Sequence, residues 1–139
     1  MTTIKALDNE LKQFFTTHPL KPRYNMEFRE QMPNIATASE VYPYVFFAFT
    51  STSSFQNVKV LTFDVYCVDA IENDRSNIID VISEMEMLIN DVFNYLFENG
   101  YISENVVKTP LNNFDLDYVG GWVASFDIVV DQTCTYGEL

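Results

Sequence analysis

The side chains best suited to chemistry in this 139-residue chain are few. His18 is the single histidine, and Cys67 and Cys134 are the two cysteines. One histidine and two distant cysteines cannot supply the four ligands of a standard zinc site. A disulfide between the cysteines is possible but unusual in a cytosolic protein, so we expect two buried or idle thiols. His18 precedes Pro19 at the end of an expected helix, without an obvious acidic or nucleophilic neighbour, and we expect it to be exposed or to have a capping role.

Paired carboxylates are the remaining catalytic candidates. Glycosidase-type chemistry needs two carboxylates across a cleft, one of them with a raised pKa. The candidate pairs are Asp115 with Asp117, Glu84 with Glu86, and Asp64 with Asp69. The first pair lies in an expected polar loop where both groups ionise freely, and the second points in directions about 200° apart on a helix. We therefore expect solvated surface carboxylates rather than an acid and a base.

No motif for a nucleotide, a phosphate or an activated nucleophile occurs in the sequence. There is no Gly-x-Gly-x-x-Gly, no phosphate-binding loop and no Gly-x-Ser-x-Gly elbow. We expect neither an enzyme nor a cofactor, and no metal site. No apolar run approaches the roughly 18 residues of a membrane span, and the first residues lack an apolar signal segment, so neither a membrane protein nor a secreted one is expected.

The charge is strongly acidic and unevenly placed. Twenty acidic and eight basic residues give a net charge of −12. Residues 1–75 hold nine acidic and seven basic residues, whereas residues 76–139 hold eleven acidic residues and one base, Lys108. Binding to nucleic acid or to an anionic membrane needs clustered Lys and Arg, so both are disfavoured. The acidic half either keeps the particle soluble, meets a basic partner, or lines a passage to which DNA must not adhere.

Hydrophobic periodicity predicts two helices and five strands. Helical spacing covers residues 3–17 and 77–99, and strand patterns cover 23–29, 41–49, 58–68, 102–108 and 122–130. Between the second and third strands, Thr50–Ser54 is expected to form a polar hairpin tip, and Pro110–Asp117 a polar bend. We expect Asp74 or Ser76 to cap the long helix, Gly100 to end it, and Gly120-Gly121 to form a bulge or a tight bend.

The order of these elements predicts an α+β fold, with one antiparallel sheet and two helices packed on one face. A single domain is expected over residues 1–131, followed by a C-terminal tail at 132–139. The second face of the sheet is partly apolar, which in a single-layer domain suggests contact with another subunit. Its candidates are Tyr42 or Tyr44, Thr62, Tyr66, Val123 and Val129.

Two oppositely charged sets are candidates for an oligomer or partner interface. The basic set lies in the most basic stretch of the chain, which is either an arm that reaches a neighbouring acidic surface or an ordinary surface connection. The acidic set lies on the outer face of the long helix, where like charges one turn apart cost a few tenths of a kcal/mol per pair, a cost consistent with a partner. The basic candidates are Lys21, Arg23 and Arg29, and the acidic candidates are Asp80, Glu84, Asp91 and Glu98.

Four segments follow one another in a suggestive order. They are an N-terminal amphipathic helix, a strand pair ending in Phe63-Asp64-Val65-Tyr66, the long helix over 77–99 and a closing Gly121-Trp122-Val123-Ala124-Ser125-Phe126-Asp127-Ile128 strand. This layout, over about residues 1–131, resembles the tail terminator (tail completion) proteins of tailed bacteriophages. The Gly-Trp start of the closing strand is its most specific part.

The resemblance implies a non-enzymatic virion subunit that forms a homo-oligomeric ring at the head–tail neck or tail end. Its partners would be copies of itself and the neighbouring neck, portal or tail rings, and DNA would pass without specific binding. Its place would be the virion, after assembly in the bacterial host cytoplasm. Two alternatives stay open: an acidic immunity or antagonist protein that covers a basic partner such as a nuclease, and an enzyme with an unrecognised carboxylate site at Asp115 or Asp117.

Overall fold

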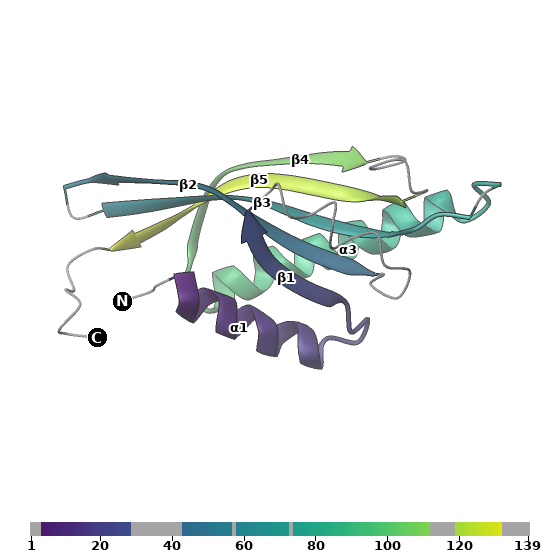
Figure 1. The fold of residues 1–139 in the computed structure, drawn as a ribbon, viewed down its shortest axis with the longest axis horizontal. Coiled ribbons are helices and arrows are strands. Elements are labelled where there is room, and N and C mark those ends of the chain that lie inside the picture. The colour runs from purple at the N-terminus through teal and green to yellow at the C-terminus, as the bar shows by residue number, and fades with distance from the viewer. Residues whose placement is uncertain (1–3, 29–42, 57, 73, 112–118, 132–139) are drawn as a thin grey trace.

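The computed structural model of the chain describes residues 4–28, 43–56, 58–72, 74–111 and 119–131 (Figure 1). The elements in this part are α1 (Ile4–Thr17), β1 (Arg23–Phe28), β2 (Tyr44–Phe55), β3 (Val58–Ala70), α3 (Ile78–Glu98), β4 (Ile102–Leu111) and β5 (Val119–Asp131). Each predicted helix and strand is therefore present. The predicted tail at 132–139 lies outside the described residues. Neither described helix combines the length and the apolar character that crossing a bilayer would require.

The five strands form one sheet in the order β1-β2-β3-β5-β4 (Figure 1). Three of the four pairings are antiparallel, whereas β1 pairs parallel with β2, from Arg23 opposite Tyr44 to Phe28 opposite Phe49. The predicted α+β class is confirmed, but the expectation of a wholly antiparallel sheet is wrong for β1. A parallel neighbour needs a connection of about a dozen residues or more, and the chain between Phe28 and Tyr44 has that length.

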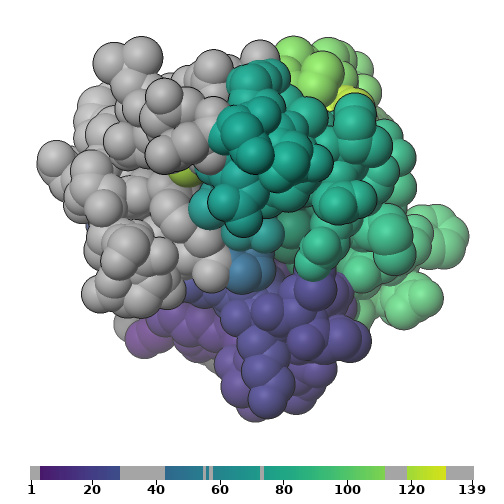
Figure 2. Space-filling model, turned by 90° about the vertical axis from the view of Figure 1, so that its right-hand side faces the viewer, coloured from purple at the N-terminus to yellow at the C-terminus, as the bar shows by residue number. Residues whose placement is uncertain are grey.

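Both helices lie on one face of the sheet, as predicted (Figure 1). In the space-filling view the N-terminal part of the chain, in purple, lies below the teal and green parts (Figure 2). The main core forms between the helices and the strands, from Leu7, Leu11 and Phe15 of α1, Val81, Met85, Leu88, Ile89, Val92 and Leu96 of α3, and the alternating apolar residues of β2, β3 and β5. At its centre the Phe63 ring lies 5.8 Å from Phe47 and 6.0 Å from Phe126, measured between centroids. Trp122 ties the layers together, because its indole N–H donates a 2.9 Å hydrogen bond to the Ile82 carbonyl of α3.

The other face of the sheet has a buried part and an open part. The buried part is a second apolar cluster made of Tyr44, Phe46, Ala48, Tyr66, Val68 and Val119. Of the residues predicted for this face, Tyr44 and Tyr66 are thus buried within the chain, and the expectation that they are open to another subunit is wrong. Thr62, Val123 and Val129 are half-buried, and Tyr42 lies outside the described residues. Only the open part of this face is available to a second molecule.

The hairpin between β2 and β3 is longer than predicted. Thr50–Ser54 is not a tip but part of β2, which pairs with β3 as far as Phe55 after a bulge at Thr50. The Thr50 hydroxyl donates a 2.9 Å hydrogen bond to the Thr62 carbonyl. Main-chain pairing with β3 therefore prevails over the turn-like composition of this segment.

The ends of α3 agree with prediction only in part. Asn77 precedes the helix in place of the predicted caps, and it makes no side-chain capping bond. Its side-chain oxygen instead accepts a 2.7 Å hydrogen bond from the Glu72 N–H, while Asp74 accepts one from the Ser76 N–H. Gly100 follows the helix with a φ of +83°, as predicted for a left-handed stop.

Gly120 and Gly121 form neither a bulge nor a bend. They continue β5 in regular register, opposite Asp69 and Val68 of β3. A Cβ added to Gly121 would lie 2.0 Å from the Cys67 carbonyl oxygen, and its φ of +150° is one that side chains rarely adopt. Glycine is required here because the two main chains approach each other closely.

We expect Gly121→Ala to lower the free energy of unfolding by about 3 kcal/mol, since a disfavoured φ and a steric overlap each cost roughly 1–3 kcal/mol. Gly100→Ala is the matched control, because its φ is also positive but no atom lies within 4 Å of the added Cβ. Its cost should be about 1 kcal/mol. Urea unfolding followed by Trp122 fluorescence measures both, and equal losses would contradict the close approach of β5 to β3.

Candidate assembly interface

The catalytic candidates form no site in the described residues. Asp64 and Asp69 lie on opposite faces of β3, because side chains alternate along a strand and five positions separate them. The pair on α3, Glu84 and Glu86, is exposed, and the pair Asp115 and Asp117 lies outside the described residues. Within the described part, no three His, Cys, Asp or Glu side chains are grouped to hold a metal ion.

His18 is buried beside an acidic residue, and the expectation of an exposed ring without such a neighbour is wrong. Its side chain is 8% exposed, and its Nε2 lies 2.9 Å from Oδ2 of Asp91 on α3. Its Nδ1 accepts a 3.1 Å hydrogen bond from the Leu20 N–H. Because Nδ1 is an acceptor, Nε2 carries the proton and donates to Asp91. The two residues are 73 positions apart, so no local pattern could have revealed this contact.

Burial shifts several titratable groups toward their neutral forms, among them Cys67, Asp69 and Tyr24. The Cys67 thiol is free and fully buried, as predicted, and burial raises its pKa. Burial also raises the pKa of Asp69, against a smaller opposing effect of the hydrogen bond from the Ala70 N–H. The pKa of Tyr24 is raised by burial first, and then by its hydrogen bond to Asp8 and by the charge of that carboxylate. None of these shifts prepares an ionised nucleophile or base.

One lateral side of the molecule, here called the β1 side, consists of α1, β1 and the turn between them. Tyr24 joins the two elements, because its ring stacks on Phe15 at 5.3 Å between centroids and its hydroxyl donates a 2.8 Å hydrogen bond to Asp8. The exposed bases of this side are Lys5, Lys12, Lys21 and Arg23. Two predicted basic candidates therefore lie beside two lysines of α1. The third, Arg29, lies outside the described residues, as does Cys134.

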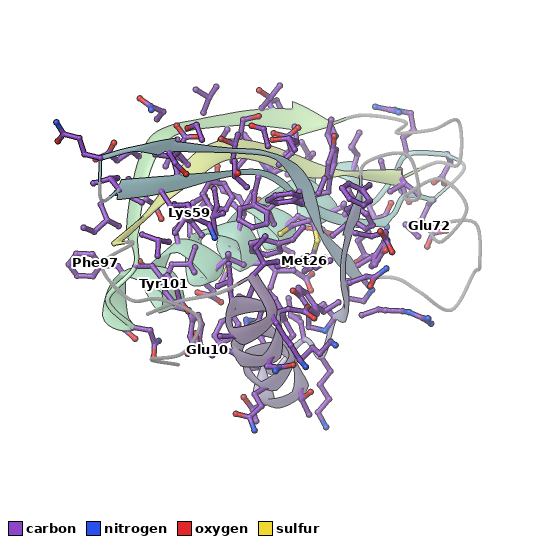
Figure 3. The ribbon with its side chains drawn as sticks, turned by 60° about the vertical axis from the view of Figure 1, so that its left-hand side comes forward. Glu10, Met26, Lys59, Glu72, Phe97 and Tyr101 are labelled. Carbon is purple, nitrogen blue, oxygen red and sulfur yellow. The ribbon has the colours of Figure 1, made fainter. Side chains whose placement is uncertain are left out.

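Two open grooves follow the line where α1 meets β1. The first, of about 490 Å³, is lined mainly by apolar side chains, with Ile4, Met26, Phe28 and Phe49 among them. The second, of about 640 Å³, is lined by Lys12, Phe15, Thr16, Lys21, Pro22 and Tyr24. Figure 3 labels Met26 on the helix side of β1. Phe28, at the first groove, is 58% exposed. The first groove also has Lys5, Asp8 and Glu27 in its lining, so only the second has bases alone as its charged residues.

The opposite lateral side, here called the β4 side, consists of β4 and α3 beneath it. Lys108 of β4 hydrogen-bonds to Asn90 of α3, and its ammonium lies 5.6 Å from the ring centroid of Phe93. Eight of the ten β4 residues are exposed. They include three aliphatic residues, Ile102, Val106 and Val107, with exposures of 58%, 40% and 61%. An edge strand with this much exposed aliphatic surface is suited to pairing with another chain.

The predicted acidic set occupies one flank of α3 rather than its outermost ridge. Its members, Asp80, Glu84, Asp91 and Glu98, are spaced by four and seven residues, which keeps them on one side of a helix. Contact with His18 identifies that side as the one nearest α1. The ridge beyond it exposes Ile79, Met87 and Phe97 instead, and Figure 3 shows Phe97 projecting from the molecule. We call the four carboxylates the acidic row.

A polar network that the sequence pattern did not reveal crosses the open part of the second sheet face. Asp127 accepts a 2.7 Å hydrogen bond from the Thr62 hydroxyl and a 2.9 Å hydrogen bond from the Asn105 amide. The Ser125 hydroxyl donates to Asp64 at 2.7 Å. Asn105, with a φ of +56°, sits at a bulge in β4, a conformation that Asn tolerates better than most residues. This face therefore carries carboxylates at the joints between β3, β5 and β4.

We expect Asp91→Ala to lower the free energy of unfolding by about 1 kcal/mol, because the His18 Nε2–H loses its acceptor. Asp91→Asn keeps a carbonyl oxygen there and should lose clearly less. Glu84→Ala is the control, since Glu84 shares the acidic row but has no hydrogen bond among the described residues. Urea unfolding measures all three. A loss no larger for Asp91→Ala than for Glu84→Ala would show that the contact does not stabilise the fold.

The raised pKa of Tyr24 predicts a loss of stability in alkali. In the unfolded chain Tyr24 ionises at its ordinary pKa of about 10, whereas the folded protein holds the neutral form. The stabilisation is complete below that pH and is lost as the pH rises above it. Tyr24→Phe cannot ionise, so its unfolding free energy should fall less steeply than that of the wild type between about pH 9 and pH 11. Identical slopes in urea unfolding would contradict this assignment.

Comparison with known proteins identifies no relative of this chain. No protein-family model matches it. No curated protein and no solved structure matches it either. The similarity in element order to tail terminator proteins therefore stays a prediction.

Proposed function

We propose that this chain is a non-enzymatic structural subunit that assembles with copies of itself into a ring, of the kind that completes the tail or neck of a tailed bacteriophage. One observation carries the proposal: both lateral sides of the sheet are open in the described residues, and they differ. The β1 side is grooved and carries charges of both signs, whereas the β4 side presents an exposed aliphatic edge. A ring of identical copies needs two unlike surfaces that meet by a rotation and close.

Charge alone does not select the lateral contact. The stretch Ile4–Phe28 holds four basic and three acidic residues, whereas Ile78–Leu111 holds one basic and six acidic residues. Four of these six acids form the acidic row, which lies on the flank of α3 nearest α1 and not at the β4 edge. The two lateral sides can therefore meet without bringing the acidic row into the contact, and the head-to-tail arrangement is supported by their unlike surfaces.

The same charges suit a ring through which DNA passes without binding. One broad surface of the subunit is the open sheet face, where Asp64 and Asp127 lie. The other is the helical surface, which carries the acidic row. In the described part of the chain, neither surface presents the clustered bases that phosphate binding requires, so either of them can face DNA. The exposed ridge of α3 then remains for a neighbouring neck, portal or tail ring.

The acidic row also supports a second candidate, an antagonist that covers a basic protein such as a nuclease. Its four carboxylates follow one flank of a helix, with a rise of about 6 Å or 10 Å from one to the next. A protein of this kind acts as a monomer or a dimer, and it binds its target in a salt-sensitive manner.

Light scattering after size exclusion, combined with electron microscopy of the purified protein over a range of concentrations, tests the proposal. We expect closed rings of one cyclic symmetry. Val107→Lys should raise the concentration needed for assembly at least about tenfold, because it places a charge at the lateral contact. Met87→Lys is the matched control, since Met87 is 67% exposed but lies on the ridge of α3. It should assemble like the wild type.

A protein that stays monomeric at every concentration contradicts the proposed ring. If that monomer also forms a salt-sensitive one-to-one complex with a basic nuclease, the second candidate is supported instead.

A further inference from the structure

We infer that β4 of one copy pairs antiparallel with β1 of the next, so that a single sheet continues from subunit to subunit around the ring. This inference rests on the proposed function and specifies its lateral contact. The partner is a second copy of this chain. The contact, here called the joint, consists of main-chain hydrogen bonds between the two edge strands, and side chains of both edges pack on either face of it.

Strand directions permit this joint without turning either copy over. β1 runs parallel to β2, and each later step across the sheet, to β3, β5 and β4, reverses the direction. The two edge strands therefore run in opposite directions. A copy placed alongside by rotation about an axis close to the strand direction presents its β1 antiparallel to the first copy's β4, which is the more stable form of pairing.

Among the residues that the structure describes, no strand pairs with the outer edge of β1. The Arg23 N–H donates to the Pro43 carbonyl, toward β2. Because alternate residues of a strand direct their main-chain groups to opposite edges, those of Tyr24 and Met26 face outward. The Phe28 N–H is bound by the side chain of its neighbour Glu27 at 3.0 Å. The Glu27 carboxylate thus already binds the Phe28 N–H, the next outward donor after Met26, and this limits the length of the pairing.

The β4 edge is limited in a similar way. Pro110 has no N–H to donate, and the bulge at Asn105 and Val106 interrupts the regular ladder. Between these two features, Val107–Thr109 remains regular, which matches the short open stretch of β1. The one charged side chain in this stretch, Lys108, is turned toward α3, where it hydrogen-bonds to Asn90. Beside it Val107 is 61% exposed, and on the other edge Phe28 is 58% exposed beside its groove. Both edges therefore have apolar surface to bury.

The register of the sheet predicts which side chains meet. Asn25, Phe46, Tyr66, Val123 and Thr109 form one row across the five strands. The two ends of the row share a level and a sheet face at opposite edges. In an unstaggered ring they are cross-strand neighbours, with Cβ atoms about 4.5–5.5 Å apart. A stagger of two residues replaces Thr109 with Val107 or Leu111, on the same face.

Disulfide trapping tests the joint. In a Cys134→Ser background, Asn25→Cys is combined in turn with Val107→Cys, Thr109→Cys or Leu111→Cys. Cys67 is kept, because it is fully buried. Lys108→Cys with Asn25→Cys is the matched control, since Lys108 lies on the same strand but on the opposite face. After mild oxidation of the assembled protein, at least one of the three pairs should give a ladder of covalent multimers up to the full ring. The control should give at least tenfold less.

The possible outcomes distinguish a failure of the proposed pairing between β4 and β1 from a failure of the proposed ring. Intact rings without a ladder from any of the three pairs would overturn the joint and leave the proposed function standing. A dimer cross-linked by Thr109→Cys alone would also overturn it, because two β4 edges would then be in contact. If the protein is monomeric before oxidation and gives no ladder of covalent multimers, both the proposed ring and the proposed pairing of β4 with β1 are contradicted.

Discussion

The burial of one sheet face beneath two helices is the constraint on which the rest of this structure depends. β3 pairs on both sides along its length, and its alternate residues supply the centre of that buried face. Trp122 and Gly121 serve the same packing, the first by binding a carbonyl of α3 and the second by letting β5 approach β3. Because the main core lies on one face of the sheet, the second face and the two edge strands must be covered by other residues, carry charges or pair with another chain.

Each remaining surface meets that requirement differently. The second face is apolar and buried near the start of β2, and further along it is crossed by hydrogen bonds between Thr62, Asn105 and Asp127. Features at both edges restrict strand pairing: Pro110 and a bulge in β4, and the Glu27 carboxylate that binds the last N–H of β1. They shorten the stretch that can pair with another strand but leave part of each edge free to do so. A short open edge suits a reversible joint between defined partners better than indefinite aggregation.

Sequence patterns predicted the strongly periodic elements, because burial of one helix stripe or one strand face leaves a local signature. α1, α3, β3 and β5 belong to this class. The patterns failed where distant parts of the chain decide. The strand character of Thr50–Ser54 comes from pairing with β3, and the parallel pairing of β1 comes from a long connection. Burial of His18 depends on Asp91, 73 residues away. The charged interface candidates were found as sets, but only the fold shows that the acidic row lies on the flank of α3 nearest α1.

The charge asymmetry of the chain follows from the same architecture. Copies that each carry a net charge of −12 would repel one another in the proposed ring. That repulsion would be smallest where at least one of the touching surfaces is not acidic. The β1 side, with four basic and three acidic residues, is such a surface. The acidic row lies on the flank of α3 nearest α1, away from the β4 edge, so it need not enter a lateral contact. In the proposed ring the acidity would remain on the broad faces, where it would keep rings apart and would not attract a phosphate backbone.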